Sequence, residues 1–294
     1  MHLVKNNLGI MWANMGFWGV RISMETDRVT GENTKKLQDL ENSLLELRSF
    51  AVAFSGGVDS SFLLAVAQKI KPEKLLAVTV SSEFVPIREI EFAKKMALSL
   101  KVDHLCLMAD VLGNEEVVQN TRERCYHCKK QIFSLVRDTA ENLGITYLLH
   151  AVNLDDLNDF RPGLRAAEEL GFISPLAAAG FTKKDIRESS RCLGLETWNK
   201  PSQSCLATRI PYHVRIEKTD LIRVDRAEAF LQSLGFAQVR VRCHEKTAGI
   251  EVEPNLVKRI LNEDIYRKVT KVLKGEGFEE VIVDRDGYKT GKMN

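Results

Sequence analysis

One short stretch constrains the fold of this chain more than any other: a pair of glycines between two apolar runs. Residues 55–61 read Ser-Gly-Gly-Val-Asp-Ser-Ser. The pattern predicts a strand, a tight loop and a helix, because Gly56 and Gly57 permit positive φ and a close approach to a ligand. Ser60 and Ser61 stand where we expect the N-cap of that helix. Unpaired N–H groups and the helix dipole at such a point favour an anion, and phosphate is the anion we expect.

The loop is not a Walker A loop, because G-x-x-x-x-G-K-[ST] occurs nowhere in the chain. Its letters S-G-G-V-D-S resemble the signature of the PP-loop ATP pyrophosphatases, which cleave ATP to AMP and pyrophosphate while adenylating an oxygen of the substrate. The resemblance implies that the ATP-binding residues are Ser55, Gly56, Gly57, Asp59, Ser60 and Ser61. The alternative is an ordinary glycine turn between a strand and a helix.

Composition indicates a globular protein with room for one large and one small domain. The chain has 294 residues, of which 44% are hydrophobic and 28% are charged. A formal net charge of +2 gives no sign of the basic stripe of a nucleic-acid binder, so we expect no nucleic-acid partner. Six cysteines are too few for a disulfide scaffold of this size. An ATP-using domain implies a reducing compartment, and we expect the cytoplasm.

The first apolar stretch, residues 8–20, is too short to cross a membrane. It also lacks the strong positive region and the clear cleavage site of a signal peptide. We therefore expect no membrane partner, a working start at Met24, and a segment 1–33 that lies outside the core. From Thr34 an amphipathic pattern predicts a helix that leads into the first strand.

Strand and helix patterns alternate after the glycine loop. Apolar runs of strand length lie at 50–54, 75–80, 102–108 and 145–149, with helical patterns at 87–100 and 125–142. This alternation predicts an α/β fold with a doubly wound parallel sheet, whose ligand binds at the carboxyl ends of the strands. The glycine loop follows such an end.

A loop with a proline at each end, residues 200–211, marks the domain boundary that we expect. Residues 34–205 then form the PP-loop domain, and residues 206–294 form a small α+β domain. In the small domain we expect a helix at 216–234, strands at 238–243, 249–252 and 281–283, and one or two helices at 254–273. Before the boundary, Thr182 and Asp185 have the spacing of a capping box.

Three cysteines lie in positions that suit chemistry. Cys125-x-x-Cys128 places two sulfurs at a helix start, where the dipole and the following lysines favour thiolates. Cys205, in the proline-bounded loop, is one further ligand, whereas structural zinc normally has four. Three thiolates suit a [4Fe–4S] cluster with one open iron; the alternative is a packed or redox-active pair. Cys106, Cys192 and Cys243 are expected to be small core residues.

Carboxylates and arginines complete the candidate site. Asp59, Asp155 and Asp156 follow predicted strand ends, and Asp59 with Asp156 would hold Mg²⁺ against pyrophosphate; solvated loop acids are the alternative. Arg240 and Arg242 share one face of a predicted strand and could grip a phosphate. They could equally form ion pairs with Glu251 and Glu253, which alternate on the neighbouring strand.

Taken together, these motifs resemble the ATP-dependent sulfur transferases of nickel-pincer cofactor synthesis, the LarE family. The matching stretches include residues 51–60, 124–129, 153–167, 174–176, 200–211 and 240–242. The resemblance implies that a carboxylate of a pyridinium dicarboxylate mononucleotide is adenylated and then attacked by sulfur. Some members spend a cysteine as dehydroalanine, whereas members with the extra Cys-x-x-Cys hold a cluster that sulfide recharges.

The resemblance also assigns roles to residues of this chain. Cys205 matches the sulfur-donating cysteine, and the substrate-binding side chains it implies are Lys129, Arg209, Arg240 and Arg242. It implies ATP, Mg²⁺ and a [4Fe–4S] cluster held by Cys125, Cys128 and Cys205, together with a sulfide or other sulfur donor and a homo-oligomer. One departure stands at 150–152, where His-Ala-Val replaces the Asp-Gly-Thr that we expect.

Other function classes stay open. A PP-loop enzyme that thiolates tRNA would need a basic surface, and an amide-forming ligase like NAD or GMP synthetase needs no Cys-x-x-Cys. A non-enzymatic nucleotide sensor with a structural metal would release no pyrophosphate.

Overall fold

The computed structural model describes residues 31–158 and 162–289. The expectations for residues 1–23, and for most of the segment 1–33, lie outside these ranges. In the described part of the chain, no helix has both the length and the apolar character that a membrane span requires.

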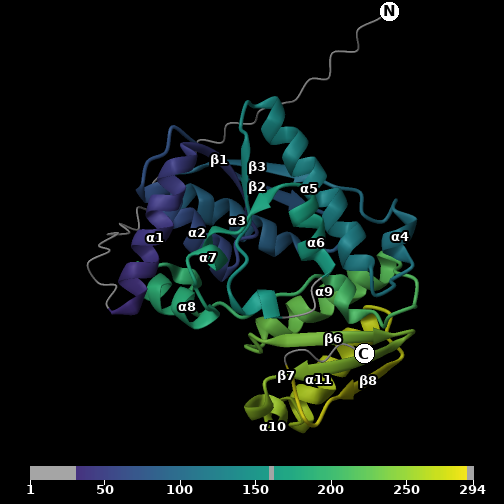
Figure 1. Ribbon diagram of the computed structural model, residues 1–294. Helices are drawn as coiled ribbons and strands as arrows, with labels where there is room; N and C mark the ends of the chain where they lie inside the picture. The colour runs from purple at the N-terminus through teal and green to yellow at the C-terminus, as the bar shows by residue number, and fades with distance from the viewer. Residues whose placement is uncertain (1–30, 159–161, 290–294) are drawn as a thin grey trace, which may run out of the picture.

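The larger sheet has five parallel strands in the order β3-β2-β1-β4-β5 (Figure 1). The strands are β1 (Ser49–Ala53), β2 (Lys74–Ser81), β3 (Asp103–Met108), β4 (Tyr147–Leu149) and β5 (Phe172–Ile173). The chain turns to opposite sides from β1, because β2 and β3 lie on one side of it and β4 and β5 on the other. This confirms the doubly wound α/β fold, in which a ligand crevice forms where the strand order reverses.

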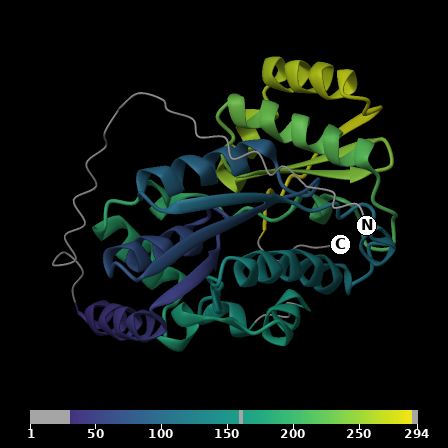
Figure 2. The same ribbon diagram turned by 90° about the horizontal axis from the view of Figure 1, so that it is seen from above.

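Helices cover both faces of this sheet (Figure 2). One face carries α1 (Glu32–Leu47), α2 (Val58–Lys69), α3 (Ile87–Ser99), α7 (Pro175–Ala178) and α8 (Lys183–Cys192). The other carries α5 (Arg124–Asn142) and α6 (Pro162–Glu169). In β1, Phe50 and Val52 pack on the first side and Ala51 on the second, because successive side chains of a strand point to opposite faces.

The smaller sheet has the order β6-β7-β8 and lies beyond the carboxyl ends of the larger one (Figure 1). Its strands are β6 (Val239–His244), β7 (Thr247–Val252) and β8 (Glu280–Val283), the first pair antiparallel and the second parallel. Helices α9 (Lys218–Ser233) and α11 (Glu263–Gly275) pack on it. Short segments complete the fold: α4 (Glu115–Val118), α10 (Val257–Ile260) and the 3₁₀ turns η2 (Asp155–Asn158), η3 (Glu196–Asn199), η4 (Leu206–Arg209) and η5 (Pro254–Leu256).

The segments that follow β2 and β3 pack into the hydrophobic core of the smaller sheet. Phe84, Val111 and Val117 come from the segment before α5, yet they pack with the buried side chains of α9 and β6. The Leu206 N–H also donates to the Phe84 carbonyl at 2.9 Å. The division into 34–205 and 206–294 stays a prediction, and any such boundary cuts through continuous apolar packing.

Local details differ from the sequence-based expectations. Cys106 is exposed rather than buried, because β3 is the edge strand of its sheet. Cys243 is buried as predicted, and Cys192 is half-buried. β4 begins two residues later than expected, and β5 was not expected at all, since two residues carry too little periodicity to be recognised.

Candidate functional site

The glycine loop joins the carboxyl end of β1 to α2. Gly56 has φ +68°, and a Cβ built on it would lie 3.0 Å from the Cα of Ala93 in α3. Both the backbone conformation and the lack of space therefore require glycine here. Gly57 is the N-cap of α2, and no side chain caps that helix. The first N–H groups of α2 are thus available to an anion at the end of the sheet.

Ser60 and Ser61 do not cap the helix, contrary to the prediction from the sequence. Because α2 already begins at Val58, Ser60 and Ser61 lie inside its first turn. The Ser55 and Ser60 hydroxyl oxygens are 3.1 Å apart, and Ser55 Oγ accepts a hydrogen bond from the Gly57 N–H at 3.3 Å. Ser61 is fully buried, and within the described residues its hydroxyl has no hydrogen-bond partner. The hydroxyls of Ser55 and Ser60 therefore shape the loop from inside.

Asp59 forms an ion pair across the end of the sheet. Its Oδ2 accepts from Lys183 Nζ at 2.5 Å, whereas its Oδ1 is buried and has no partner in the described part of the protein. Burial raises the pKa of this carboxyl, and Lys183 opposes that rise. A buried carboxylate with one free oxygen beside a phosphate loop has the chemistry of a Mg²⁺ ligand.

The two other candidate acids lie on η2, near the same lysine. Asp155 Oδ2 accepts from the Lys183 N–H at 2.8 Å, so this carboxylate caps the start of α8. Asp156 Oδ2 accepts from the Asn153 N–H at 3.2 Å, and its charge acts on Asp59. Among the described residues, no three His, Cys, Asp or Glu side chains are close enough together to hold a metal ion.

Lys200 connects the phosphate loop to the loop that carries Cys205. Its Nζ donates to the Gly56 carbonyl at 3.1 Å and to Glu89 Oε2 at 2.8 Å. The same ammonium lies 3.6 Å from the centroid of the Phe92 ring. The two stretches are far apart in sequence, and this contact brings them into one site.

Arg209 holds the Cys205 loop in place. It is buried and forms a bidentate pair with Glu228, with Nε–Oε1 2.8 Å and Nη2–Oε2 3.1 Å. Its remaining nitrogen donates to the carbonyls of Ser204 and Cys205, each at 3.1 Å. The guanidinium that the resemblance assigned to the substrate thus supports the backbone on either side of the sulfur.

The two arginines of β6 also contact this loop. Arg240 is buried and donates to the Ser202 carbonyl and to Gln203 Oε1. Burial, with Arg209 nearby, lowers the pKa of Arg240 to about 10. Arg242 donates to the Thr208 carbonyl at 2.7 Å and pairs with Glu251 at 3.0 Å. Ion pairing with the neighbouring strand, the alternative to phosphate binding, is therefore present between Arg242 and Glu251.

The cysteine pair opens α5. Arg124, one residue ahead of Cys125, donates to the Cys125 Sγ at 3.8 Å and to the Ala207 carbonyl at 3.1 Å. Burial, and then the charges of Cys205 and Cys125, raise the pKa of the Cys128 thiol to about 12. The three sulfurs therefore lie near enough to act on one another electrostatically, although within the described ranges they are not in reach of one metal ion.

Lys129 and His150 lie at the edge of the candidate site. Lys129 is exposed, with Nζ 5.1 Å from the centroid of the Phe133 ring. His150, at the departure from the expected Asp-Gly-Thr, is buried against Phe133 and Phe172, and its Nε2 lies 2.5 Å from Ser174 Oγ. Burial lowers the pKa of His150 to about 4, so the ring is neutral at pH 7. It is part of the interior and does not present a charge to a ligand.

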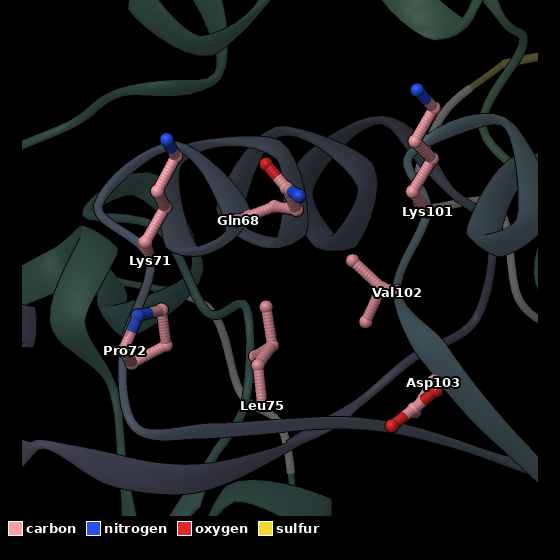
Figure 3. Close-up of a pocket in the computed structure, with 7 residues that line it drawn as sticks. All are labelled: Gln68, Lys71, Pro72, Leu75, Lys101, Val102 and Asp103. Carbon is pink, nitrogen blue, oxygen red and sulfur yellow. The ribbon is translucent and has the colours of Figure 1, made fainter.

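A hollow of about 230 Å³ lies away from these residues (Figure 3). It is lined by Gln68, Lys71, Leu75, Lys101 and Val102, where α2 ends and where β2 and β3 begin. The glycine loop lies at the opposite ends of the strands. The hollow is therefore separate from the candidate site.

Comparison with known proteins identifies the family. The asparagine synthase family matches residues 40–151, which include the glycine loop. The pyridinium-3,5-bisthiocarboxylic acid mononucleotide synthase of Lactiplantibacillus plantarum is 35% identical over 89% of this chain and 94% of its own. This chain belongs to the LarE family. An uncharacterised protein of Synechocystis is 36% identical over 88% of this chain and 97% of its own.

A more distant relative of the family shares only part of the chain. The glutamine-hydrolysing GMP synthase of Thermoplasma acidophilum has a subunit that is 28% identical over 58% of this chain and 60% of its own. The likeness to the LarE relative extends over far more of the chain. The family assignment therefore rests on both sheets rather than on the phosphate loop alone.

Several polar residues of this LarE-family site were missed by sequence reasoning. They are Lys183, Lys200, Glu228, Arg124 and Asn120. Lys183 directly follows the Thr182 cap, and Lys200 and Arg124 lie within the matching stretches, so their positions were visible. Their partners were not, because each contact joins segments that are distant in sequence.

Proposed function

We propose that this protein is an ATP-dependent sulfur transferase. It adenylates a carboxylate of pyridinium-3,5-biscarboxylic acid mononucleotide and converts it to the thiocarboxylate. A substrate carboxylate oxygen attacks the α-phosphorus of ATP, and pyrophosphate leaves. A sulfur nucleophile then attacks the acyl carbon, and AMP leaves with the former carboxylate oxygen. Membership of a family that includes a bisthiocarboxylic acid mononucleotide synthase supports this reaction.

The glycine loop serves the adenylation step. The N–H groups at the start of α2 would bind the departing pyrophosphate, with Lys183 and Lys200 as the neighbouring cations. Asp59 and Asp156 would hold Mg²⁺, which neutralises phosphate charge when it is bound. The free Oδ1 of Asp59 supports this assignment, because a buried oxygen without a partner is costly unless a ligand completes it.

Arg240 and Arg242 would hold the substrate phosphate. At present their donors are used by the carbonyls of Ser202 and Thr208 and by Glu251. A phosphate is a stronger acceptor than a carbonyl, because hydrogen bonds between two charged groups are about twice as strong as neutral ones. Substrate binding would therefore shift the loop around Cys205. The exposed Lys129 would complete the substrate side of the site, and the buried Arg209 would act on the substrate through the loop that it holds.

The sulfur atom that is transferred can come from either of two sources. Three thiols, here Cys125, Cys128 and Cys205, are the donor type and number that a [4Fe–4S] cluster with one open iron requires. In the described part of the chain they are not grouped closely enough to hold one metal ion, so cluster binding would have to bring them together. Such a cluster would supply sulfide from an external donor when it is bound. In the alternative, Cys205 gives up its own sulfur and becomes dehydroalanine. We favour the cluster, because Cys125 and Cys128 would serve no purpose in a single-use reaction.

One observation carries the proposal: the Lys200–Gly56 hydrogen bond of 3.1 Å. It places the phosphate loop beside the segment that ends in Cys205. A site that both activates a carboxylate with ATP and delivers sulfur to it needs these two parts together. We also infer that the protein is cytoplasmic, because an ATP-using domain implies a reducing compartment. The family resemblance further implies a homo-oligomer.

The adenylation step is tested with ATP, Mg²⁺ and pyridinium-3,5-biscarboxylic acid mononucleotide. We expect AMP and pyrophosphate, and appearance of ADP would exclude a PP-loop reaction. Asp59→Ala should release no pyrophosphate and should keep the wild-type circular dichroism spectrum. Binding of tRNA, or amide formation with ammonia, would favour the thiolation or ligase alternatives.

The sulfur step is tested by anaerobic reconstitution followed by mass spectrometry after turnover. A three-cysteine cluster predicts about four irons per chain, repeated turnover with added sulfide, and loss of activity in Cys125→Ala, Cys128→Ala and Cys205→Ala. The sacrificial route predicts a chain lighter by one hydrogen sulfide at position 205. Activity that survives in Cys125→Ala would then exclude the cluster.

A further inference from the structure

Arg124 occupies an unusual position between the cysteine-bearing segments. Its side chain is 2% exposed, so the charged guanidinium is buried. One terminal nitrogen donates to the Ala207 carbonyl, two residues after Cys205, and the other donates to Cys125 Sγ. A single side chain therefore contacts both the helix of Cys125 and the turn that follows Cys205.

Asn120 extends this connection. It is fully buried with φ +56°, and its side-chain oxygen accepts from Arg124. Its side-chain nitrogen donates to the Pro211 carbonyl at 2.7 Å and to the Val214 carbonyl at 3.1 Å. Arg124 and Asn120 thus join residues 207–214 to the start of α5 by hydrogen bonds, in addition to the apolar packing of Ala207 and Ile210.

The charge of Arg124 has no carboxylate partner within residues 31–158 and 162–289, since all of its hydrogen bonds there go to the groups already named. A buried, permanently charged guanidinium is costly unless an anion compensates it. The nearby groups that can be anionic are Cys205, Cys125 and the phenol of Tyr212, which lies over the guanidinium at 5.6 Å. Of these, Cys125 Sγ accepts a hydrogen bond from the guanidinium, and Cys205 lies two residues before the Ala207 carbonyl that the guanidinium also bonds.

We propose that Arg124 is the positioning residue that ties the Cys205 loop to the Cys125-x-x-Cys128 turn and presents one fixed positive charge to their sulfurs. It acts on the chemistry through the cysteines and does not contact substrate. This proposal rests on the sulfur transfer proposed above, which explains why the two cysteine-bearing segments need to be held together. The tie itself is a property of the protein alone and can be measured without turnover.

The test compares three full-length variants in the reduced, metal-free state by hydrogen–deuterium exchange. Arg124→Met removes both the charge and the planar guanidinium group. Arg124→Lys keeps the charge but lacks the planar group that bridges two acceptors. Arg122→Met is the matched control, because Arg122 is an exposed arginine two residues away. We expect the amides of residues 206–216 to exchange at least about tenfold faster in both Arg124 variants and at the wild-type rate in Arg122→Met.

Exchange in residues 62–67, in the buried part of α2, separates local loosening from loss of the fold. The tie is supported if residues 206–216 are affected in Arg124→Lys while residues 62–67 keep the wild-type rate. Wild-type exchange of residues 206–216 in both Arg124 variants would overturn the proposal.

The charge is tested by iron uptake during anaerobic reconstitution. We expect Arg124→Met to retain less than about half of the wild-type iron per chain, and Arg124→Lys to retain more than Arg124→Met, because net charge affects how well a cluster is held. Equal iron in Arg124→Met and wild type would exclude the role of the charge. If the wild type itself takes up no iron, the cluster route of the proposed function fails, and the exchange experiment still decides whether Arg124 ties the loop.

Discussion

The arginines of the site are buried or half-buried and are already hydrogen-bonded, which determines how each of them can act. Arg209 has Glu228 as its counter-ion, and Arg242 has Glu251. Arg240 bonds only to neutral acceptors in the described part of the chain, and burial lowers its pKa. An incoming phosphate would offer this guanidinium the charge partner that the carbonyls do not.

Arg242→Ala should weaken binding of the nucleotide substrate by about tenfold or more, because it removes one charged hydrogen-bond donor to phosphate. ATP binding should change much less, since Arg242 lies on β6, away from the glycine loop. Calorimetric titration of each ligand measures both effects. Equal losses for ATP and substrate would place the phosphate site elsewhere, and Arg226→Ala, at an exposed position of α9, is the control.

His150 gives a prediction on pH and stability. Burial lowers its pKa from 6.5 to about 4, so between these values the unfolded chain binds a proton that the folded chain does not. Stability should therefore be greatest above pH 6.5 and should fall as the pH drops toward 4, by about 3 kcal/mol from this residue. Urea denaturation of wild type and His150→Gln across this range measures the difference.

In His150→Gln the loss of stability between pH 6.5 and pH 4 should be smaller by about 3 kcal/mol, because the contribution of His150 is absent. His244→Gln, which removes an exposed imidazole, controls for the loss of a histidine as such. An unchanged pH dependence in His150→Gln would mean that this ring accepts a proton in the folded protein.

At the scale of elements, the start of α8 positions a cation over the phosphate loop. Thr182 Oγ1 accepts from the Asp185 N–H, and Asp185 accepts from the Thr182 N–H, which confirms the predicted capping box. Lys183 is the first residue of the helix, and Asp155 bonds its N–H. The cap thus fixes the backbone from which Lys183 reaches Asp59.

Thr182→Ala should lower the free energy of unfolding by about 1 kcal/mol, the usual cost of losing an N-cap side chain. Thr182→Ser keeps a hydroxyl at the same position and should lose less than half of that. Urea denaturation of both variants gives the comparison. A loss in Thr182→Ser as large as that in Thr182→Ala would show that the threonine methyl group, and not the hydrogen bond, is the stabilising part.

In the whole molecule, the two parts of the fold are coupled by apolar packing between the smaller sheet and the segments that follow β2 and β3. Phe84 is 2% exposed and lies among the buried side chains of the C-terminal part. Its carbonyl also accepts from Leu206, the first residue of η4. Loosening this contact would therefore disturb the Cys205 segment together with the packing between the sheets.

Phe84→Ala should destabilise the protein by about 3–5 kcal/mol, because it leaves a cavity in a packed core. Wild type should unfold in one transition, and the variant should show either a lower single midpoint or two separate ones. Thermal unfolding followed by fluorescence and circular dichroism tests this. Leu98→Ala, at a position that is 77% exposed, is the control and should change stability by no more than about 0.5 kcal/mol.

The features of this protein that depend on local pattern could be predicted from its amino-acid sequence. Continuous apolar runs predicted β1 to β4 of the larger sheet, although not β5, and the alternation of strand and helix patterns predicted its parallel, doubly wound arrangement. The spacing of Thr182 and Asp185 predicted the cap of α8, and Gly56 marked a turn that only glycine can make. These features depend on residues within one or two turns of each other, so a linear reading contains them.

The pairs of side chains that contact each other could not be predicted in this way and are known only from the folded structure. Nothing in the local pattern pairs Lys183 with Asp59, Lys200 with Gly56, or Arg124 with the turn after Cys205, because these partners are 83 to 144 positions apart. The edge position of β3, which exposes Cys106, follows from strand order and not from the strand's own residues. Long-range contacts form where buried charges are paired and where apolar faces pack against other elements. Both depend on the fold of the whole chain.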